Sequence, residues 1–212
     1  MDFKIGKILP DIPESIYPVM TGLAIKHNAI NLAQGFPGFS VDKELINLVN
    51  KYMLLGNNQY APMMGVFDLR CNLSDKIQSL YGHVYNPKTE ICITAGATQG
   101  IFTAVSALVN KGDEVIIIDP AFESYEPVVK FNGGKVKRSP LKSKTFEIDW
   151  KDIQSKVTER TRMLIINTPQ NPTGRLFSTN DIQELRKIVL NTKIIILSDE
   201  VYEHIVFDGK KH

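Results

Sequence analysis

Three polar residues follow the ends of two short apolar runs in the second half of this sequence. Asn171 comes shortly after the run 163–167, and Asp199 and Tyr202 follow the run 194–198. Polar side chains of defined type therefore stand at the exits of two expected buried strands, which is where ligands bind in α/β sheets. An amide, a carboxylate and a phenol placed in this way are suited to hold a pyridine ring that carries a phenolate oxygen.

Asp199 is the candidate partner for the nitrogen of such a ring. A pyridine-type ring accepts electrons only while its nitrogen stays protonated, and a buried carboxylate beside it stabilises that charge. The Asn171 amide and the Tyr202 phenol can both donate hydrogen bonds to the ring oxygen. The alternatives are a helix N-cap for Asp199 and a packed aromatic for Tyr202, and each of these would have to hold independently.

A third candidate is the segment Ala95-Gly96-Ala97-Thr98-Gln99-Gly100, where we expect a strand to end and a helix to begin. Backbone N–H groups at a helix start favour a phosphate. The small side chains allow close approach, and the Thr98 hydroxyl can donate one more hydrogen bond. Alternatively, Gly96 and Gly100 only permit a tight turn and close packing.

Phe122 is the fourth candidate, and it follows the next expected strand within Asp119-Pro120-Ala121-Phe122. An aromatic ring at a strand exit can stack on the face of a flat ligand. The alternative is that Phe122 covers the edge of the sheet, and the segment taken by itself leaves both interpretations open.

From residue 90 onward, apolar runs alternate with amphipathic segments. This pattern predicts an α/β fold with a largely parallel sheet covered by helices on both faces. An acidic capping box is predicted between Ser178 and Asp181. The expected strands are 91–94, 114–118, 135–139, 163–167 and 194–198, and the expected helices are 98–109, 124–131, 152–157 and 182–190.

The first 39 residues show little periodicity and contain four prolines, which remove backbone donors. We therefore expect an extended N-terminal arm that lies on another surface, such as a partner subunit. Two helices are expected next, one opened by Ser40 and ended by Gly56, and one over 66–81. The prolines are Pro10, Pro13, Pro18 and Pro37, and the apolar face of the first helix is Val41, Leu45, Val49 and Tyr52.

The composition is that of an ordinary globular chain, with 212 residues of which 43% are hydrophobic. A formal net charge of +2 argues against a nucleic-acid partner. We expect no signal peptide, because the charged start of the sequence lacks an apolar segment, and no apolar run reaches membrane-spanning length. Cys71 and Cys92 form no CxxC pair, and the four histidines are too far apart to suggest a metal site. We expect a cytoplasmic protein without a membrane or metal partner.

Taken together in chain order, these motifs resemble the fold-type I pyridoxal-phosphate-dependent aminotransferases of class I/II. The segments 33–37 and 120–127 look most similar to the methionine, kynurenine and glutamine aminotransferase branch. The motifs that carry the resemblance are Gly35-Phe36-Pro37, Tyr60, Gly96-Ala97-Thr98, Phe122, Asn171-Pro172-Thr173-Gly174 and Asp199-Glu200-Val201-Tyr202. They extend over nearly the whole chain.

The resemblance implies pyridoxal 5'-phosphate as the cofactor and a role for each matching residue. Gly96, Ala97 and Thr98 would hold its phosphate, and Phe122 would stack on its ring. Asp199 would pair with the ring nitrogen, while Asn171 and Tyr202 would bind the ring oxygen. The peptide bonds Asp119-Pro120 and Asn171-Pro172 are expected to be cis.

The resemblance also implies a homodimer with a shared site. Tyr60 would reach the phosphate held by the neighbouring subunit. Gly35 would line the pocket for the substrate carboxylate, which Asn171 would also touch. We therefore expect residues 1–39 to form an N-terminal arm and small-domain segment, and residues 40–212 to form the N-terminal portion of the cofactor-binding large domain.

One element of the family pattern does not match any residue of this sequence. The family forms its Schiff base through a lysine downstream of the Asp–Tyr segment, and none of the residues after Asp199 has that context. We therefore expect the sequence to be the N-terminal part of a protein roughly twice as long, with an incomplete large domain, and to be inactive by itself.

Three functions are compatible with these residues. The first is transfer of the amino group of a neutral amino acid, such as methionine, glutamine or an aromatic amino acid, to a 2-oxo acid. The second is carbon–sulfur β-elimination on the same fold. The third is a catalytically inactive fragment that binds the cofactor or a partner.

Overall fold

The structure is a computed structural model that describes residues 14–212. These residues form two compact units, one of residues 14–94 and one of residues 95–212, and each is described by itself. The predictions for Pro10 and Pro13 lie outside the described residues.

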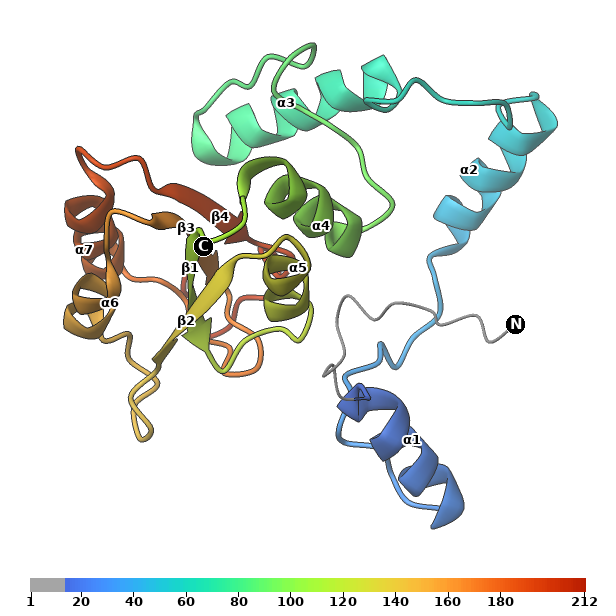
Figure 1. The fold of residues 1–212 in the computed structure, drawn as a ribbon. Coiled ribbons are helices and arrows are strands. Elements are labelled where there is room, and N and C mark those ends of the chain that lie inside the picture. Colours follow the sequence, from blue (N-terminus) through green and yellow to red (C-terminus); the bar gives the residue numbers. More distant parts are fainter. Residues whose placement is uncertain (1–13) are drawn as a thin grey trace, which may run out of the picture. The chain divides into compact units, whose positions relative to one another are not determined.

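The unit of residues 95–212 is built on a four-stranded parallel sheet (Figure 1). The strand order is β2-β1-β3-β4, so consecutive strands of the chain are not always neighbours. The strands are β1 (Glu114–Asp119), β2 (Lys135–Pro140), β3 (Thr161–Asn167) and β4 (Ile195–Asp199). The parallel sheet predicted from the apolar runs is therefore confirmed, as are four of the five predicted strands.

Helices cover both faces of this sheet (Figure 1). Side chains alternate along a strand, so Val115 and Ile117 of β1 join one buried cluster while Ile116 and Ile118 join the other. The first cluster includes residues of α4 (Ala97–Leu108) and α5 (Tyr125–Phe131), and the second includes residues of α6 (Trp150–Lys156) and α7 (Thr179–Val189).

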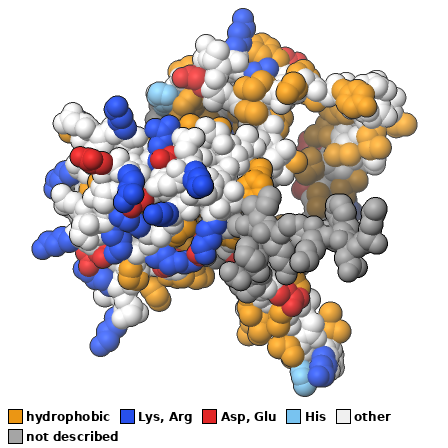
Figure 2. All heavy atoms as spheres, viewed as in Figure 1, with side chains coloured by type: hydrophobic (Ala, Val, Ile, Leu, Met, Phe, Trp, Pro, Cys, Tyr) orange, Lys and Arg blue, Asp and Glu red, His pale blue; other side chains and the backbone are white. Residues whose placement is uncertain are grey.

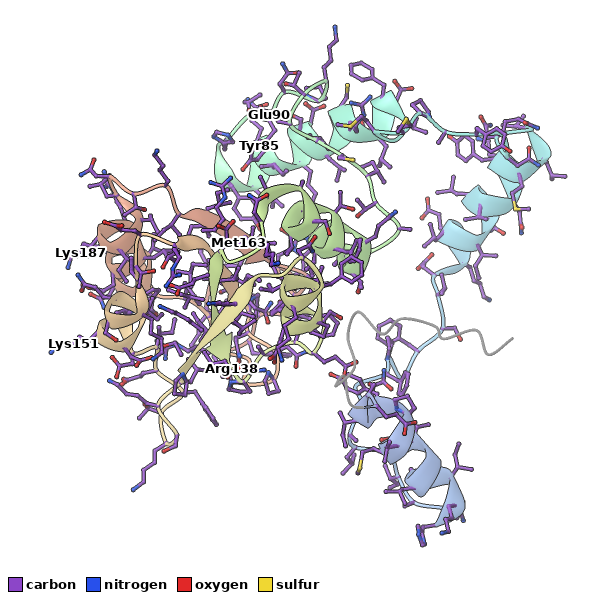
Figure 3. All side chains as sticks on the ribbon, in the orientation of Figure 1. Tyr85, Glu90, Arg138, Lys151, Met163 and Lys187 are labelled. Atoms are coloured by element: carbon purple, nitrogen blue, oxygen red, sulfur yellow. The ribbon has the colours of Figure 1, made fainter. Side chains whose placement is uncertain are left out.

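Exposed lysines lie on the outer surfaces of α6 and α7, whereas the centre of the sheet between the helix layers is formed by buried apolar side chains of β1 and β3. Lys151 and Lys187 point away from the sheet, and Met163 lies inside it with no exposed surface (Figure 3).

The predicted capping box at the start of α7 is also confirmed, because the Ser178 side chain accepts from the Asp181 N–H while the Asp181 side chain accepts from the Ser178 N–H. Such a box satisfies donors that a helix start otherwise leaves unpaired.

The unit of residues 14–94 contains three helices, α1 (Ile16–Lys26), α2 (Lys43–Leu54) and α3 (Phe67–Tyr81). The helix predicted from Ser40 forms, but Asp42 caps it in place of Ser40. Its predicted apolar face is exposed, and Figure 2 shows hydrophobic side chains over α1 and α2. The helix predicted over 66–81 is confirmed.

Two sequence predictions in this unit need correction. The expected extended arm is helical over α1, because Pro18 falls in the first turn, where its missing N–H has no helix partner to lose. The predicted strand 91–94 is wrong: no strand forms there, and the Ile93 N–H instead donates to the Met64 carbonyl at 3.0 Å. A strand needs a ladder of partners, which a single backbone bond does not supply.

The segment after α3 is held against that helix by polar contacts. Arg70 Nη1 donates to the Pro87 carbonyl at 2.5 Å, and the Ser74 hydroxyl donates to the Tyr85 carbonyl at 2.6 Å. Tyr85 and Glu90 both lie on this segment (Figure 3). The Glu90 carboxylate accepts from the Asn86 N–H at 2.6 Å, which closes the turn.

Candidate functional site

The carboxyl edge of the sheet carries most of the residues singled out from the sequence. β3 and β4 end in register, with Asn167 opposite Asp199. The start of α4 lies beside the end of β4, where both line a hollow of about 320 Å³. Its lining residues are Ala97, Gly100, Ile101, Ala104, Leu197, Ser198, Asp199, Glu200 and Val201. The expected anion-binding helix start and the expected ring-nitrogen partner are therefore neighbours.

The start of α4 is not capped by any side chain. Gly96 is the N-cap residue with a φ of 85°, a conformation that glycine adopts without strain. The Gln99 side chain turns back and accepts from the Ala95 N–H at 2.5 Å. Ala97 and Thr98 occupy the first turn, so their backbone N–H groups point out of the helix start, where a helix favours an anion.

Asp199 is held from two sides. The phenol of Tyr125 donates to Asp199 Oδ2 at 2.6 Å, and the Val201 N–H donates to Oδ1 at 3.2 Å. The Asp199 backbone carbonyl accepts from Asn167 Nδ2 at 2.8 Å and from the Thr168 N–H at 3.1 Å. Both the carboxylate and the backbone of Asp199 are thus fixed in orientation.

Tyr125 is buried, with 2% of its surface exposed. This burial raises the pKa of the Tyr125 phenol, and the hydrogen bond and negative charge of Asp199 raise it further. The phenol therefore stays protonated around neutral pH and acts only as a donor to the carboxylate.

Phe122 lies on the segment of residues 119–124, which we call the Phe122 segment. Its ring meets the Tyr125 ring edge-on, with 5.7 Å between the centroids, and packs partly against the buried cluster beneath α4 and α5. Arg138 anchors the start of the segment through both carboxylate oxygens of Asp119, at 2.6 and 2.8 Å. The predicted cis bond Asp119-Pro120 is confirmed.

Asn171 lies on the turn of residues 170–175, which we call the Asn171 turn. Its N–H donates to Asn167 Oδ1 at 2.7 Å, so the side chain of Asn167 bridges Asn171 and Asp199. The predicted cis bond Asn171-Pro172 is confirmed, and Thr168-Pro169 is also cis. The turn and the residues after β4 line a second hollow of about 410 Å³, to which both Asn171 and Tyr202 contribute.

The structure thus brings the candidate residues of residues 95–212 to one sheet edge but divides them between two hollows. Ala97 lies with Asp199 in one, and Asn171 lies with Tyr202 in the other, whereas Gly96, Thr98 and Phe122 line neither of these two hollows. Gly35 and Tyr60 belong to the unit of residues 14–94, and their roles stay predictions.

Three residues that support this edge were not identified from the sequence as site residues: Tyr125, Asn167 and Gln170. Each forms its key contact with a residue that is distant along the chain. Tyr125 is 74 positions from Asp199, and Gln170 is 50 positions from Pro120. No local spacing marks such pairs, although Asn167 stands at a strand exit, which is a weak signal.

A parallel sheet with helices on both faces and polar groups gathered at its carboxyl edge defines an α/β domain of the kind that binds a ligand there. Residues 27–212 match the family model described as aminotransferase class I and II. The chain belongs to this family, which confirms the resemblance found in its motifs.

Several relatives have known functions. The chain is 41% identical to the methionine aminotransferase of Escherichia coli K12 over 96% of its own length and 53% of that protein's length. It is 35% identical to the kynurenine–oxoglutarate transaminase of Dictyostelium discoideum, with coverage of 99% and 52%. The chain therefore spans about half the length of the curated relatives it matches.

Solved structures of aminotransferases are also similar to this chain, and the chain again covers about half of each. YbdL of Escherichia coli, for which a methionine aminotransferase function is described, superposes with a TM-score of 0.96 at 40% identity, over 99% of this chain and 55% of that one. The N-succinyldiaminopimelate aminotransferase of Mycobacterium tuberculosis superposes with a TM-score of 0.93 at 35% identity, with coverage of 99% and 55%. Among residues 14–212, no helix combines the length and apolar character that a membrane crossing requires.

Proposed function

We propose that the full-length protein is a pyridoxal-phosphate-dependent aminotransferase and that residues 95–212 hold its cofactor. The observation that carries this proposal is the shared hollow of Asp199 and the α4 start. A carboxylate supported by a buried neutral phenol faces the same space as a helix start without a side-chain cap. This combination suits a ligand that is cationic at one end and anionic at the other.

The residues present fit the cofactor group by group. Gly96, Ala97 and Thr98 would hold the phosphate through the α4 start, and Asp199 would hold the proton on the ring nitrogen. Phe122 would lie against the ring face, while Asn171 and Tyr202 would donate to the ring oxygen. When bound, pyridoxal phosphate supplies the electron sink that amino-group transfer requires.

We further propose a homodimer in which each subunit contributes to its partner's site. Tyr60 would bind the phosphate held by the neighbouring subunit, and Gly35 with Asn171 would receive the substrate carboxylate. Tyr60 is fully exposed and Gly35 is also exposed in the unit of residues 14–94, which leaves both accessible. The relatives are about twice as long, and we propose that the Schiff-base lysine belongs to the rest of the full-length protein.

The proposed substrates are a neutral amino acid and a 2-oxo acid. The relatives that support this choice are the methionine aminotransferase at 41% identity and the kynurenine–oxoglutarate transaminase at 35% identity. Glutamine and aromatic amino acids are the other candidate substrates. A cytoplasmic location stays a prediction from the sequence.

Carbon–sulfur β-elimination is the second candidate function, because the residues described above would serve it equally. A fragment that binds the cofactor or a partner without catalysis is the third.

Two measurements on the full-length protein test this proposal. Borohydride reduction in the presence of pyridoxal phosphate should add one pyridoxyl group to the intact mass, and methionine should then consume a 2-oxo acid. Release of ammonia and pyruvate from cystathionine, without any need for a 2-oxo acid, would instead identify a β-lyase. A protein that acquires no adduct and turns over neither substrate would contradict both enzymatic functions.

A further inference from the structure

Gln170 is a buried amide at the start of the Asn171 turn. Only 6% of its surface is exposed. It directly follows one cis proline, Pro169, and stands two residues before another, Pro172. A buried amide that lacked partners would cost free energy. The structure gives partners to both ends of this side chain.

The oxygen end of Gln170 closes the Asn171 turn. Gln170 Oε1 accepts from the Thr173 N–H at 3.1 Å and also from the Thr173 hydroxyl. The backbone of Gln170 adds two bonds, since its N–H donates to the Arg175 carbonyl at 2.8 Å and its carbonyl accepts from the Gly174 N–H at 2.7 Å. The turn is therefore a rigid unit on which Asn171 is mounted.

The nitrogen end of Gln170 leaves the turn and reaches the other segment. Gln170 Nε2 donates to the carbonyl of Pro120, two residues before Phe122. Pro120 follows β1 and Gln170 follows β3, and these strands are neighbours in the sheet. One side chain thus connects the two segments at the carboxyl edge.

We propose that Gln170 is a positioning residue that fixes the separation between the Phe122 segment and the Asn171 turn. This inference rests on the proposed function, in which Phe122 contacts the face of the cofactor ring and Asn171 contacts its oxygen. The relative positions of Phe122 and Asn171 then depend on the length of one amide side chain, while the phosphate-binding start of α4 is independent of Gln170.

The position requires an amide of this length. Oε1 must accept and Nε2 must donate, and glutamine provides both functions in one group. Asparagine keeps both functions but is one methylene shorter, so it cannot bond Thr173 and Pro120 together. Methionine keeps the length of the side chain but supplies no donor.

The test compares Gln170→Met and Gln170→Asn with the wild type in the full-length protein. Gln154→Met is the matched control, because it makes the same substitution at an exposed position of α6 that lies outside both segments. The measured quantities are the affinity for pyridoxal phosphate, the circular dichroism of its bound absorption band, and thermal stabilisation of the cofactor-free protein by inorganic phosphate.

Both Gln170 variants should bind pyridoxal phosphate about tenfold more weakly, which corresponds to one lost buried hydrogen bond. Their bound circular dichroism band should shrink, while stabilisation by inorganic phosphate and the behaviour of Gln154→Met should match the wild type. Wild-type affinity and circular dichroism in both variants would overturn the inference, as would an equal loss of phosphate stabilisation or a failure of both variants to fold. A wild type that binds no pyridoxal phosphate would instead overturn the proposed function itself.

Discussion

Asp181 and Asp199 stand at the same edge of the sheet but differ in how fully they are bonded. Asp181 is 4% exposed and accepts four hydrogen bonds, from the Ser178 N–H and hydroxyl, Trp150 Nε1 and Arg175 Nη2. Within the described residues, the structure gives the Asp199 carboxylate two donors, Tyr125 and the Val201 N–H. Since a carboxylate has room for about four bonds, Asp181 is saturated and Asp199 keeps capacity for a ligand.

The helices that start beside these two carboxylates differ in the same way. α7 is closed by its own capping box, whereas no side chain caps α4. One helix start therefore contributes to the stability of the fold, and the other leaves its first-turn donors for an anion. Substitutions at Asp181 should change stability, and substitutions at Asp199 should change cofactor chemistry.

The largest expected effect follows replacement of Asp181 by alanine. The variant leaves the indole N–H of Trp150 and the charge of Arg175 without their buried partner and removes half of the α7 capping box. The free energy of unfolding of the full-length protein should fall by about 3 kcal/mol, measured by urea denaturation. A loss below about 1 kcal/mol would show that the four hydrogen bonds of Asp181 contribute little to the stability of the fold.

Replacement of Asp199 by asparagine should act on catalysis instead. The amide still accepts from Tyr125 but no longer carries the charge that holds a proton on the ring nitrogen. We expect kcat/KM for the proposed transamination to fall about a hundredfold, with a change in unfolding free energy below about 1 kcal/mol. Large destabilisation with an unchanged rate per folded molecule would reverse the assignment of the two carboxylates.

Acidification should test the structural role of Asp181 without relying on catalysis. Burial alone would raise the pKa of Asp181, but bonds from Ser178 and Trp150 and the charge of Arg175 outweigh it and hold this pKa below its ordinary value of 3.8. A lowered carboxyl pKa contributes stability that is present above the unfolded value and lost as pH falls through the folded value.

Wild-type unfolding free energy should therefore fall more steeply than that of Asp181→Asn as pH drops below about 4. Urea denaturation of both proteins at a series of pH values measures the difference. Parallel curves would mean that the Asp181 carboxyl does not titrate differently in the folded and unfolded states.

Removal of one oxygen from Tyr125 is the mildest change. Phenylalanine keeps the edge-on contact with Phe122 but loses the donor to Asp199 Oδ2. The affinity for pyridoxal phosphate should weaken about fivefold, as measured by fluorescence titration of the full-length protein. In a double-mutant cycle with Asp199→Asn the two effects should not add, and simple additivity would show that Tyr125 acts independently of Asp199.

Local patterns predicted most of the fold that surrounds this edge. The alternation of strand and helix patterns predicted β1, β2, β3 and β4, and the Ser178–Asp181 spacing predicted the cap of α7, because these features depend on residues close in sequence. The α1 helix was missed because Pro18 was interpreted as a breaker rather than as a first-turn residue. The strand expected at 91–94 failed because strand formation depends on a partner that its own sequence does not specify.

In the candidate site, too, local patterns identified some residues but not the contacts that orient them. Asp199, Asn171 and Phe122 could be selected because each occupies a strand exit, and the family resemblance predicted the cis bonds Asp119-Pro120 and Asn171-Pro172. The bonds that orient them could not be predicted, because Tyr125, Asn167 and Gln170 reach residues 74, 32 and 50 positions away. Only the packed sheet brings these pairs together.

The saturated carboxylate also gives the molecule an optical probe. Trp150 is the one tryptophan among the 212 residues, its indole N–H donates to Asp181 at 2.9 Å, and its ring meets Phe177 edge-on at 6.0 Å. Within this chain, tryptophan emission therefore reports changes in the surroundings of Trp150 and Asp181. Absorption of a bound cofactor would report changes in the surroundings of Asp199. The two carboxylates can be followed at separate wavelengths in one sample.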